Sequence, residues 1–480
     1  MSADQFPSHW KVVPLSEAVD ALIDYRGKTP KKTDHGIPLV TAKIVKGGTI
    51  LTAKEFIAEE DYDSWMVRGL PHAGDIVVTT EAPLGEVAQL SNANVALAQR
   101  IVTLRGAEGL LLNDYLRYVM QGAYVQGQLE SRASGSTVKG IKQSELRKVL
   151  LPIPPRHEQR GIASQLRSID DKIQLNHQIN QTLEQMAQAI FKSWFVDFEP
   201  VKAKIAALEA GGSEDDALLA AMQAISGKTP EDLSRLQAEQ AEQPEQYAEL
   251  RATAELFPSA MQDSEQGEIP EGWSVSQIGY EVTVVGGGTP STKNPTFWED
   301  GQISWTSPKD LSNLPDKILV ETERKITEAG LSKISSGLLP VNTVLMSSRA
   351  PVGYLALAKI PIAVNQGYIA MKCEKVLSPE FVIQWCVAHM DEIKSRASGT
   401  TFAEISKKNF KIIPLAMPPK PLISIYSRQT SSLYEAIENN VRESDTLETI
   451  RDSLLPKLLS GELSLPSIQE QPELQVVASV

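Results

Sequence analysis

Two stretches of the chain place apolar residues at alternating steps of four and three, the spacing of a coiled-coil seam. The first seam consists of Ile162, Leu166, Ile169, Ile173, Asn176, Asn180, Leu183, Ala187, Ile190 and Trp194. Adding 264 to each number gives a second, weaker seam of Tyr426, Thr430, Leu433, Ile437, Asn440, Ser444, Leu447, Arg451, Leu454 and Leu458. The pattern predicts two long helices, each with a polar centre between apolar ends.

The polar centres coincide, because Asn176 and Asn440 occupy the same place in the two seams. A polar residue in an apolar seam lowers stability but can fix register and orientation. We expect the helices to pair antiparallel, with the repeats related by a pseudo-two-fold axis near these residues. The alternative is two unrelated amphipathic helices whose asparagines face solvent. The expected pairing residues are Ile169, Ile173, Asn176, Asn180, Leu183, Leu433, Ile437, Asn440 and Leu447.

Sequence repeats extend upstream of both seams. "RASGST" at 132–137 returns as "RASGTT" at 396–401, and "TTEAPLGEVA" at 79–88 resembles "SSRAPVGYLA" at 347–356. Short β-rich runs such as "GDIVVTT" and "NTVLMSS" alternate with helix-like runs that follow Asn or Ser. The fold class predicted is α+β, with two similar globular domains separated by the two long helices.

Composition limits the environment and the partners. The chain has 480 residues, too many for one compact core, and only two cysteines, which fits a reducing cytoplasm. It shows neither an apolar run long enough to span a membrane nor a signal-peptide pattern. The net charge of -13 argues against DNA binding, but residues 201–270, with 5 basic and 14 acidic residues, supply most of it. The two globular segments can therefore carry local basic faces.

Motifs that suggest catalysis are incomplete. "NPTF" at 294–297 lacks the second proline of an adenine methyltransferase motif, and "RGKT" at 26–29 has Leu22 where a P-loop needs glycine. "VVGGGTP" at 284–290 leads into Pro rather than a helix, so it is a weak phosphate cradle. Pro315, Asp316, Glu323 and Lys325 fit a nuclease pattern only at short spacing in a charged segment. We therefore predict neither a catalytic site nor a metal site.

Polar loops give a positive signal, because Lys, Arg and hydroxyl side chains suit phosphates while Asn, Gln and Arg suit base edges. Any solvated loop has a similar composition, so the signal depends on the repeat. The DNA-contact residues predicted in the first half are Arg26, Lys28, Thr29, Lys31, Lys32, Thr79, Thr80, Gln99, Arg100, Ser134, Ser136, Thr137 and Lys139. Those predicted in the second half are Thr289, Ser291, Lys293, Lys309, Ser347, Ser348, Arg349, Asn365, Gln366, Ser398 and Thr400.

The layout resembles the specificity subunit of type I restriction-modification systems, from "WKVVPLSEAV" at 10–19 to "IRDSLLPKLLSGEL" at 450–463. The most telling tract is "LPIPPRHEQR" at 151–160, and "AIFKSWFVDFEPV" at 189–201 and "GEIPEGWSV" at 267–275 support it. The second copy, "LAMPPKPLISIYSR" at 415–428, lacks the Glu-Gln pair, so its contacts are expected to differ.

The resemblance implies two target-recognition domains that each read one part of a bipartite DNA site. It implies that the helices set the gap and dock two modification subunits, which carry S-adenosylmethionine. A restriction subunit using ATP and Mg would join them. The chain itself would be a non-catalytic, cytoplasmic specificity subunit without a cofactor of its own.

The expected divisions are a first recognition domain at 1–155, a spacer helix at 156–200, an acidic helical connector at 201–270, a second recognition domain at 271–419, a C-terminal spacer helix at 420–465 and a disordered tail at 466–480. Two other functions stay open at this stage. One is a stand-alone DNA-modifying enzyme, which methylation by the purified chain would reveal. The other is a two-headed protein scaffold, which footprinting on DNA would exclude.

Overall fold

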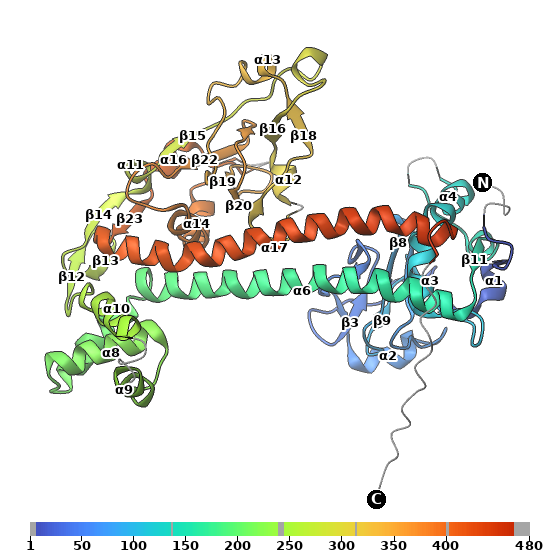
Figure 1. Ribbon diagram of the computed structural model, residues 1–480, viewed down its shortest axis with the longest axis horizontal. Helices are drawn as coiled ribbons and strands as arrows, with labels where there is room; N and C mark the ends of the chain where they lie inside the picture. The colour runs from blue at the N-terminus through green and yellow to red at the C-terminus, as the bar shows by residue number, and fades with distance from the viewer. Residues whose placement is uncertain (1–5, 136–137, 239–243, 313, 400–402, 465–480) are drawn as a thin grey trace, which may run out of the picture. The chain divides into compact units, whose positions relative to one another are not determined.

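The computed structural model describes residues 6–135, 138–238, 244–312, 314–399 and 403–464 (Figure 1). The chain forms two compact units, one from residues 1–173 and 446–480 and the other from residues 174–445. Both units mix helix and sheet, as the sequence predicts. The tail expected at 466–480 lies outside the described residues, and the six expected divisions stay a prediction.

The first unit contains a four-stranded antiparallel sheet of order β2-β10-β7-β8. Its strands are β2 (Val19–Asp24), β10 (Ile101–Gly106), β7 (Ile76–Thr80) and β8 (Leu84–Gln89). The smaller sheets are β6-β3-β9 (Phe56–Ile57, Ile37–Val40, Ala96–Leu97), β4-β5 (Val45–Lys46, Thr49–Ile50) and β1-β11 (Lys11–Pro14, Leu150–Ile153). The short helices are α1 (Leu15–Ala18), α2 (Glu59–Trp65), α3 (Asn113–Gln121), α4 (Ala123–Arg132) and α5 (Gln143–Leu146).

The second unit contains a five-stranded sheet of order β15-β22-β19-β20-β17. Its strands are β15 (Thr283–Val285), β22 (Tyr368–Lys372), β19 (Val344–Ser347), β20 (Leu355–Ala358) and β17 (Ile318–Leu319). The smaller sheets are β18-β16-β21 (Arg324–Ile326, Ile303–Thr306, Ala363–Val364), β12-β13 (Met261–Ser264, Gly267–Pro270) and β14-β23 (Ser274–Gln277, Pro414–Met417). The helices of this domain are α11 (Ile278–Glu281), η3 (Pro295–Phe297), α12 (Pro308–Ser312), α13 (Glu328–Leu331), α14 (Pro379–Ala388), α15 (Met390–Ser395) and α16 (Lys407–Lys411).

The two domains share a common topology, apart from the additional strand β17 in the second and the β4-β5 pair in the first. The order β2-β10-β7-β8 recurs as β15-β22-β19-β20, and β6-β3-β9 recurs as β18-β16-β21. In both three-stranded sheets the middle strand has one antiparallel and one parallel neighbour. The central strands β7 and β19 are buried along their whole length, and their sequences, IVVTT and VLMS, are mainly apolar or β-branched. The sequence repeat is therefore a repeat of fold.

Two long helices, α6 (Arg156–Phe195) and α17 (Lys420–Ser460), each follow a Pro-containing turn and contribute to both units. Within the first unit Asp170 pairs with Arg451. Within the second unit Asn176 contacts Ser444, whereas Phe191, further along α6, packs near Tyr426. Residue numbers rise on one helix as they fall on the other, so the helices pack antiparallel, as predicted (Figure 1).

The C-terminal ends of both long helices complete the domain cores. Leu458 and Leu459 of α17 are buried in the core of the first unit, with Ile162 and Leu166 of α6. At the positions 264 residues earlier, Trp194 and Phe195 of α6 are buried in the core of the second unit. Each such side chain contributes about 1.5–3 kcal/mol of hydrophobic stabilisation. Each domain core therefore includes residues of both helices.

The connector consists of α7 (Glu199–Glu209), α8 (Glu214–Ser226), α9 (Pro230–Ala238) and α10 (Pro244–Glu255). A break at Gly211 and Gly212 separates α7 from α8, and Ser213 begins α8 with a capping box to Asp216. The connector has a small core of its own around Leu218, Met222, Leu233, Tyr247 and Ala254. No helix among the residues described is both long and apolar enough to cross a membrane.

Candidate nucleic-acid interface

The repeated "RASG" sequence closes a short loop in each domain. In the first domain Ser134 and Gly140 exchange two backbone hydrogen bonds of 2.9 Å. Gly135 lies at a φ of 115°, and a Cβ there would overlap the carbonyl oxygen of Val138, so the turn requires glycine. The backbone N–H of Ile141 donates to the carbonyl oxygen of Thr80 at 3.1 Å, which fixes the loop beside the end of β7.

The loop of the second domain has the same frame. Ser398 and Glu404 exchange backbone hydrogen bonds of 3.0 and 2.9 Å, and the N–H of Ile405 donates to the carbonyl oxygen of Ser348 at 3.0 Å. Gly399 lies at a φ of 125°. Ser136, Thr137 and Thr400, which are predicted from the sequence to contact DNA, lie outside the described residues.

Several predicted contact residues of the first domain meet around its loop, and we call Arg26, Thr80, Arg100 and Ser134 the first loop cluster. Arg26 donates from Nη1 to the carbonyl oxygen of Ile141 at 2.5 Å and pairs with Asp24 at 2.6 Å. The N–H of Thr80 donates to the carbonyl oxygen of Arg100 at 3.0 Å. The end of β7, the residue before β10 and the loop closed by Ser134 and Gly140 thus lie together at one edge of the domain.

The second loop cluster consists of Thr289, Ser348, Arg349, Gln366 and Ser398. The N–H of Ser348 donates to the carbonyl oxygen of Gly367 at 2.8 Å, and Thr289 Oγ1 donates to Gln366 Oε1 at 2.7 Å. Arg349 Nη1 lies 3.9 Å from Glu404 Oε2. Asn365 is also close, because its Oδ1 accepts from the N–H of Gly367 at 2.7 Å.

Four of the predicted hydroxyl residues are buried, and two of them belong to the loop clusters. Thr79, Thr80, Ser347 and Ser348 are buried at strand ends. Thr79 Oγ1 accepts from the N–H of Glu86, and Ser347 Oγ donates to the carbonyl oxygen of Pro351, so these hydroxyls already serve the fold.

The remaining predicted residues lie nearer the surface. Lys32 pairs with Glu55 and Lys309 with Glu323, while Gln99 is half-buried. The exposed ones are Lys28, Thr29, Lys31, Lys139, Ser291 and Lys293. Their contact with DNA stays a prediction.

An aromatic cluster in the second domain was not predicted from the sequence. The guanidinium carbon of Arg324 lies 3.6 Å from the centroid of a Trp298 ring and 5.4 Å from a Trp305 ring. The neighbouring "NPTF" tract forms the short helix η3, with Asn294 capping it. Two tryptophans seven residues apart in a polar segment were the signal available in the sequence.

The polar centre of the helix pair is a layer of amides and hydroxyls. Asn176 Nδ2 donates to Ser444 Oγ at 3.2 Å and to Glu443 Oε2 at 2.8 Å, and Asn440 Nδ2 donates to Asn180 Oδ1 at 2.9 Å. Ser444 stands 264 residues after Asn180, just as Asn440 stands 264 after Asn176. Each contact therefore joins the same two repeat positions, one from each helix. The two contacts are related by a local two-fold axis.

The other predicted pairing residues are also covered. Ile173 and Ile437 are buried, and Ile169, Leu183, Leu433 and Leu447 are partly buried.

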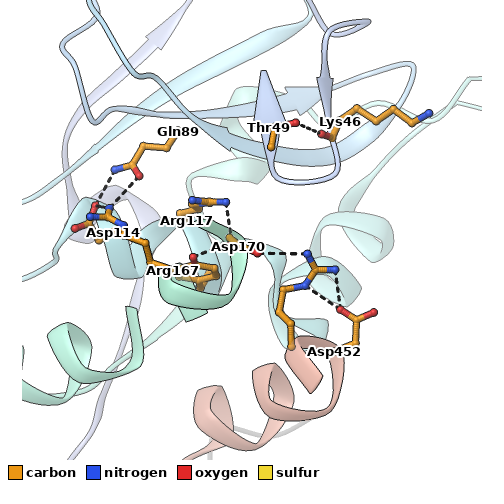
Figure 2. A network of polar contacts seen from close by, with 10 residues as sticks. Lys46, Thr49, Gln89, Asp114, Arg117, Arg167, Asp170 and Asp452 are labelled. Atoms are coloured by element: carbon orange, nitrogen blue, oxygen red, sulfur yellow. Dashed lines mark hydrogen bonds and ion pairs between the residues drawn. The ribbon is translucent and has the colours of Figure 1, made fainter. Parts of the chain in front are cut away.

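Acidic residues with little exposure hold each domain on the helices within its own unit. In the first unit Asp170 of α6 accepts a hydrogen bond from Arg117 Nη2 at 2.8 Å (Figure 2). It accepts another from Tyr118 Oη at 2.9 Å, and both donors belong to α3. Arg451 of α17 approaches the other oxygen of Asp170 at 3.3 Å. Burial raises the pKa of Tyr118, which keeps this phenol a donor. A second pair, Arg167 with Asp114, lies one turn away.

In the second unit the acidic residue comes from the domain instead. Asp316 Oδ2 accepts from Asn180 Nδ2 at 2.9 Å and lies 2.9 Å from His177 Nδ1, both on α6. Lys359 of the domain pairs with Glu438 of α17 at 3.3 Å. Asp316 belongs to the segment that fits a nuclease pattern, and here it anchors the domain to a helix.

The Glu-Gln pair of "RHEQR" makes contacts that the second copy lacks. Glu158 Oε2 accepts from Trp10 Nε1 at 2.9 Å. Gln159 Nε2 donates to the carbonyl oxygens of Leu110 and Pro154, each at 2.8 Å, and its Oε1 accepts from the N–H of Leu112 at 2.9 Å.

Leucine and isoleucine take these places in the second copy. Leu422 and Ile423 are buried in the apolar core, and the buried Nε1 of Trp273 has no partner among the described residues. The expected difference between the copies is therefore present.

The described residues offer little for covalent or metal chemistry. They contain no group of three or more His, Cys, Asp or Glu side chains placed to hold a metal ion. Burial raises the pKa of the Cys373 thiol to about 12 and also raises the pKa of Cys386. A thiol must ionise to act as a nucleophile, so neither cysteine is activated.

The fold is a duplicated α+β domain with a pair of long helices, and similarity to known sequences identifies its family. Residues 7–185 and 270–441 match the model of the type I restriction modification DNA specificity domain. The chain therefore belongs to the type I restriction-modification DNA specificity family.

Named relatives agree with this assignment. The chain is 35% identical over 380 residues to the type I restriction enzyme HindI specificity subunit of Haemophilus influenzae, covering 78% of this chain and 79% of that protein. It is 25% identical to the MjaIX specificity subunit of Methanocaldococcus jannaschii, covering 97% of this chain and 96% of that protein. Among solved structures, the S subunit of a type I restriction-modification system from M. genitalium is similar, with 14% identity, a TM-score of 0.48 and coverage of 94% of this chain and 96% of that one.

Proposed function

We propose that this chain is the DNA-specificity subunit of a type I restriction-modification complex and has no catalytic site of its own. Each domain reads one half of a bipartite site in double-stranded DNA, and the paired helices set the gap between the halves. The observation that carries the proposal is the duplication, since two domains of one topology present equivalent loop clusters and are each anchored to the same helix pair. Differences between the loop clusters suit half-sites of different sequence.

The helices also dock two modification subunits in this proposal. Met186 on α6 has an exposed fraction of 48%, and Ile450, at the position 264 residues later on α17, has 42%. Exposed apolar side chains at repeat-equivalent positions favour two equivalent docking sites for one kind of partner. Replacing both with glutamate should weaken assembly with the modification subunit, because two charges would be desolvated on docking. Glutamate at the exposed polar positions Gln185 and Thr449 is the matched control.

Under this proposal, the catalytic activities belong to the partner subunits. The modification subunits bind S-adenosylmethionine and methylate adenine, and a restriction subunit uses ATP and Mg to translocate and cleave DNA. The complex acts in the cytoplasm.

The decisive experiment is methylome sequencing of cells that express the chain together with its modification subunit. We expect methylated adenines within one bipartite sequence, and no methylation by the purified chain with S-adenosylmethionine alone. Exchange of the first domain for that of a relative should change one half of the site and keep the other. Methylation without sequence preference, or methyl transfer by the chain alone, would overturn the proposal.

A further inference from the structure

Arg324 in β18 is an exposed cation that lies over an indole ring. Its guanidinium carbon lies 3.6 Å from the Trp298 centroid, and the rings of Trp298 and Trp305 meet edge to face with centroids 5.1 Å apart. In the described part of the chain, Arg324 forms no ion pair. Stacking leaves the N–H groups at the edge of the guanidinium available as donors.

Both tryptophans are fixed by hydrogen bonds, so the stacked arginine has a defined orientation. Trp305 Nε1 donates to the carbonyl oxygen of Gly288 at 3.0 Å, and Trp298 Nε1 donates to that of Ser291 at 3.1 Å. Arg324 and Trp305 are also direct partners in the pairing of β18 with β16. A cation ordered before binding loses less side-chain entropy when it makes a contact.

The aromatic cluster is continuous with the second loop cluster. The segment from Gly288 to Ser291, which receives both indole N–H groups, contains Thr289, whose hydroxyl bonds Gln366. Within the second unit, β16 and β18 lie on the side away from α17 (Figure 1). Arg324 is therefore next to the loops that we assign to DNA and away from the helix that anchors the domain.

The first domain lacks this arrangement, although it has the same sheet. In the equivalent pairing of β3 with β6, the N–H of Leu39 donates to the carbonyl oxygen of Glu55 at 2.9 Å. Leu39 and Glu55 thus occupy the places of Trp305 and Arg324, and Glu55 pairs with Lys32. Since the fold forms without the stacked arginine, the cluster serves the second domain alone.

We propose that Arg324 contacts DNA in the half-site read by the second domain. The inference rests on the proposed function and deepens it. The guanidinium fork donates two hydrogen bonds to adjacent acceptors on the duplex, which are either two phosphate oxygens or O6 and N7 of one guanine. Trp298 positions Arg324 and does not itself contact a base.

The test uses the full chain in complex with its modification subunit and a duplex carrying the site found by methylome sequencing. We expect Arg324→Ala to weaken binding about 10-fold or more, within the range for a lost DNA contact. Lys325→Ala is the matched control, because it removes one exposed cation from the adjacent position, whose side chain points to the opposite face of the strand. Its effect should stay within about 2-fold, the size expected for loss of a distant charge.

A third variant, Arg324→Lys, distinguishes between phosphate and guanine as the group that Arg324 contacts. If the guanidinium binds phosphate, lysine should restore most of the affinity. In that case Arg324→Ala should also reduce the slope of the logarithm of the binding constant against the logarithm of salt concentration by about 1. If it binds guanine, lysine should not restore discrimination at one base pair of the second half-site, while the first half-site stays unaffected.

The outcomes for this inference and for the proposed function are distinct. The role of Arg324 would be overturned if the wild-type complex binds the site and Arg324→Ala binds it with the same affinity. It would also be overturned if Lys325→Ala lowers the affinity as much as Arg324→Ala does. Wild-type complex that binds all duplexes alike would overturn the proposed function instead.

Discussion

Asn440 donates from Nδ2 to Oδ1 of Asn180 at 2.9 Å across the helix pair. Asn180 also donates to the buried Asp316, so one amide joins α17, α6 and the second domain. Asn176 takes the place of Asn440 in the other contact, but its own Oδ1 is buried without a partner among the described residues. The two asparagines of α6 therefore have unequal energetic roles.

We expect Asn180→Leu to destabilise the protein by about 2–3 kcal/mol, because it leaves the Asn440 amide and the Asp316 carboxylate short of partners in a buried layer. Asn176→Leu should cost less, about 1 kcal/mol, because removal of an already unsatisfied carbonyl oxygen partly offsets the hydrogen bonds lost from Nδ2. Urea denaturation compares the two variants. Equal losses would show that the Asp316 contact contributes nothing.

Replacing both Asn176 and Asn440 by leucine should make the register of the helix pair less defined. Cysteine crosslinking at successive positions of α6 and α17 measures this register. The wild-type chain should crosslink at one alignment, whereas the double variant should crosslink at alignments one heptad apart. A single alignment in the double variant would contradict a register role for the polar layer.

Asp170→Ala should destabilise the first unit by about 3 kcal/mol, because it leaves the nearly buried Arg117 without its counter-charge. Asp452→Ala is the control: Asp452 also pairs with Arg451, but its side chain is 67% exposed. Its removal should cost about 0–1 kcal/mol. Thermal unfolding of the two variants at low and high salt checks the contrast, and comparable losses would argue against Asp170 as the anchor of α3.

Gln159→Ile copies the second repeat into the first and should cost about 2–4 kcal/mol. The change leaves two carbonyl oxygens and one N–H, those of Leu110, Pro154 and Leu112, without partners. The same change at Gln165, which is exposed on the same helix, should have little effect. Denaturation midpoints of the two variants measure this difference.

Lengthening both α6 and α17 by one heptad should widen the gap between half-sites by about 3 base pairs. Seven helical residues add about 10 Å at 1.5 Å per residue, and a base pair of B-DNA rises 3.4 Å. Methylome sequencing of cells expressing the lengthened chain with its modification subunit reports the gap directly. An unchanged gap would disprove the spacer role of the helices.

His389 should make the protein less stable in mild acid. Burial lowers the pKa of His389 below the ordinary histidine value of about 6.5, while its ring stacks on Trp385. The unfolded chain therefore binds a proton more readily than the folded chain, and stability falls as the pH drops through about 6.5 towards the folded pKa. His389→Phe should reduce the difference in denaturation midpoint between pH 7.5 and 5.5. His35→Phe, at an exposed site, should leave that difference unchanged.

The helix pair was predictable from sequence because heptad spacing is local and repeats along about 35 residues. The paired domains were predictable because two copies of one sequence fold alike. Arg324 was missed because strand pairing brings it to Trp298, 26 residues earlier in the chain, and neither residue alone marks a site. Thr79 and Ser347 illustrate the opposite difficulty, since polar residues at a strand end resemble a loop in sequence yet are buried.

The exchange of helix ends between the domains has a consequence for synthesis on the ribosome. When residues 1–200 have been translated, the first domain still lacks Leu458 and Leu459, which fill its core beside Gly122 and Ile162. That nascent domain must therefore expose apolar surface until the last helix emerges, more than 250 residues later. At a synthesis rate of about 5–20 residues per second, this interval is about 13–50 seconds, a window in which chaperones would be needed.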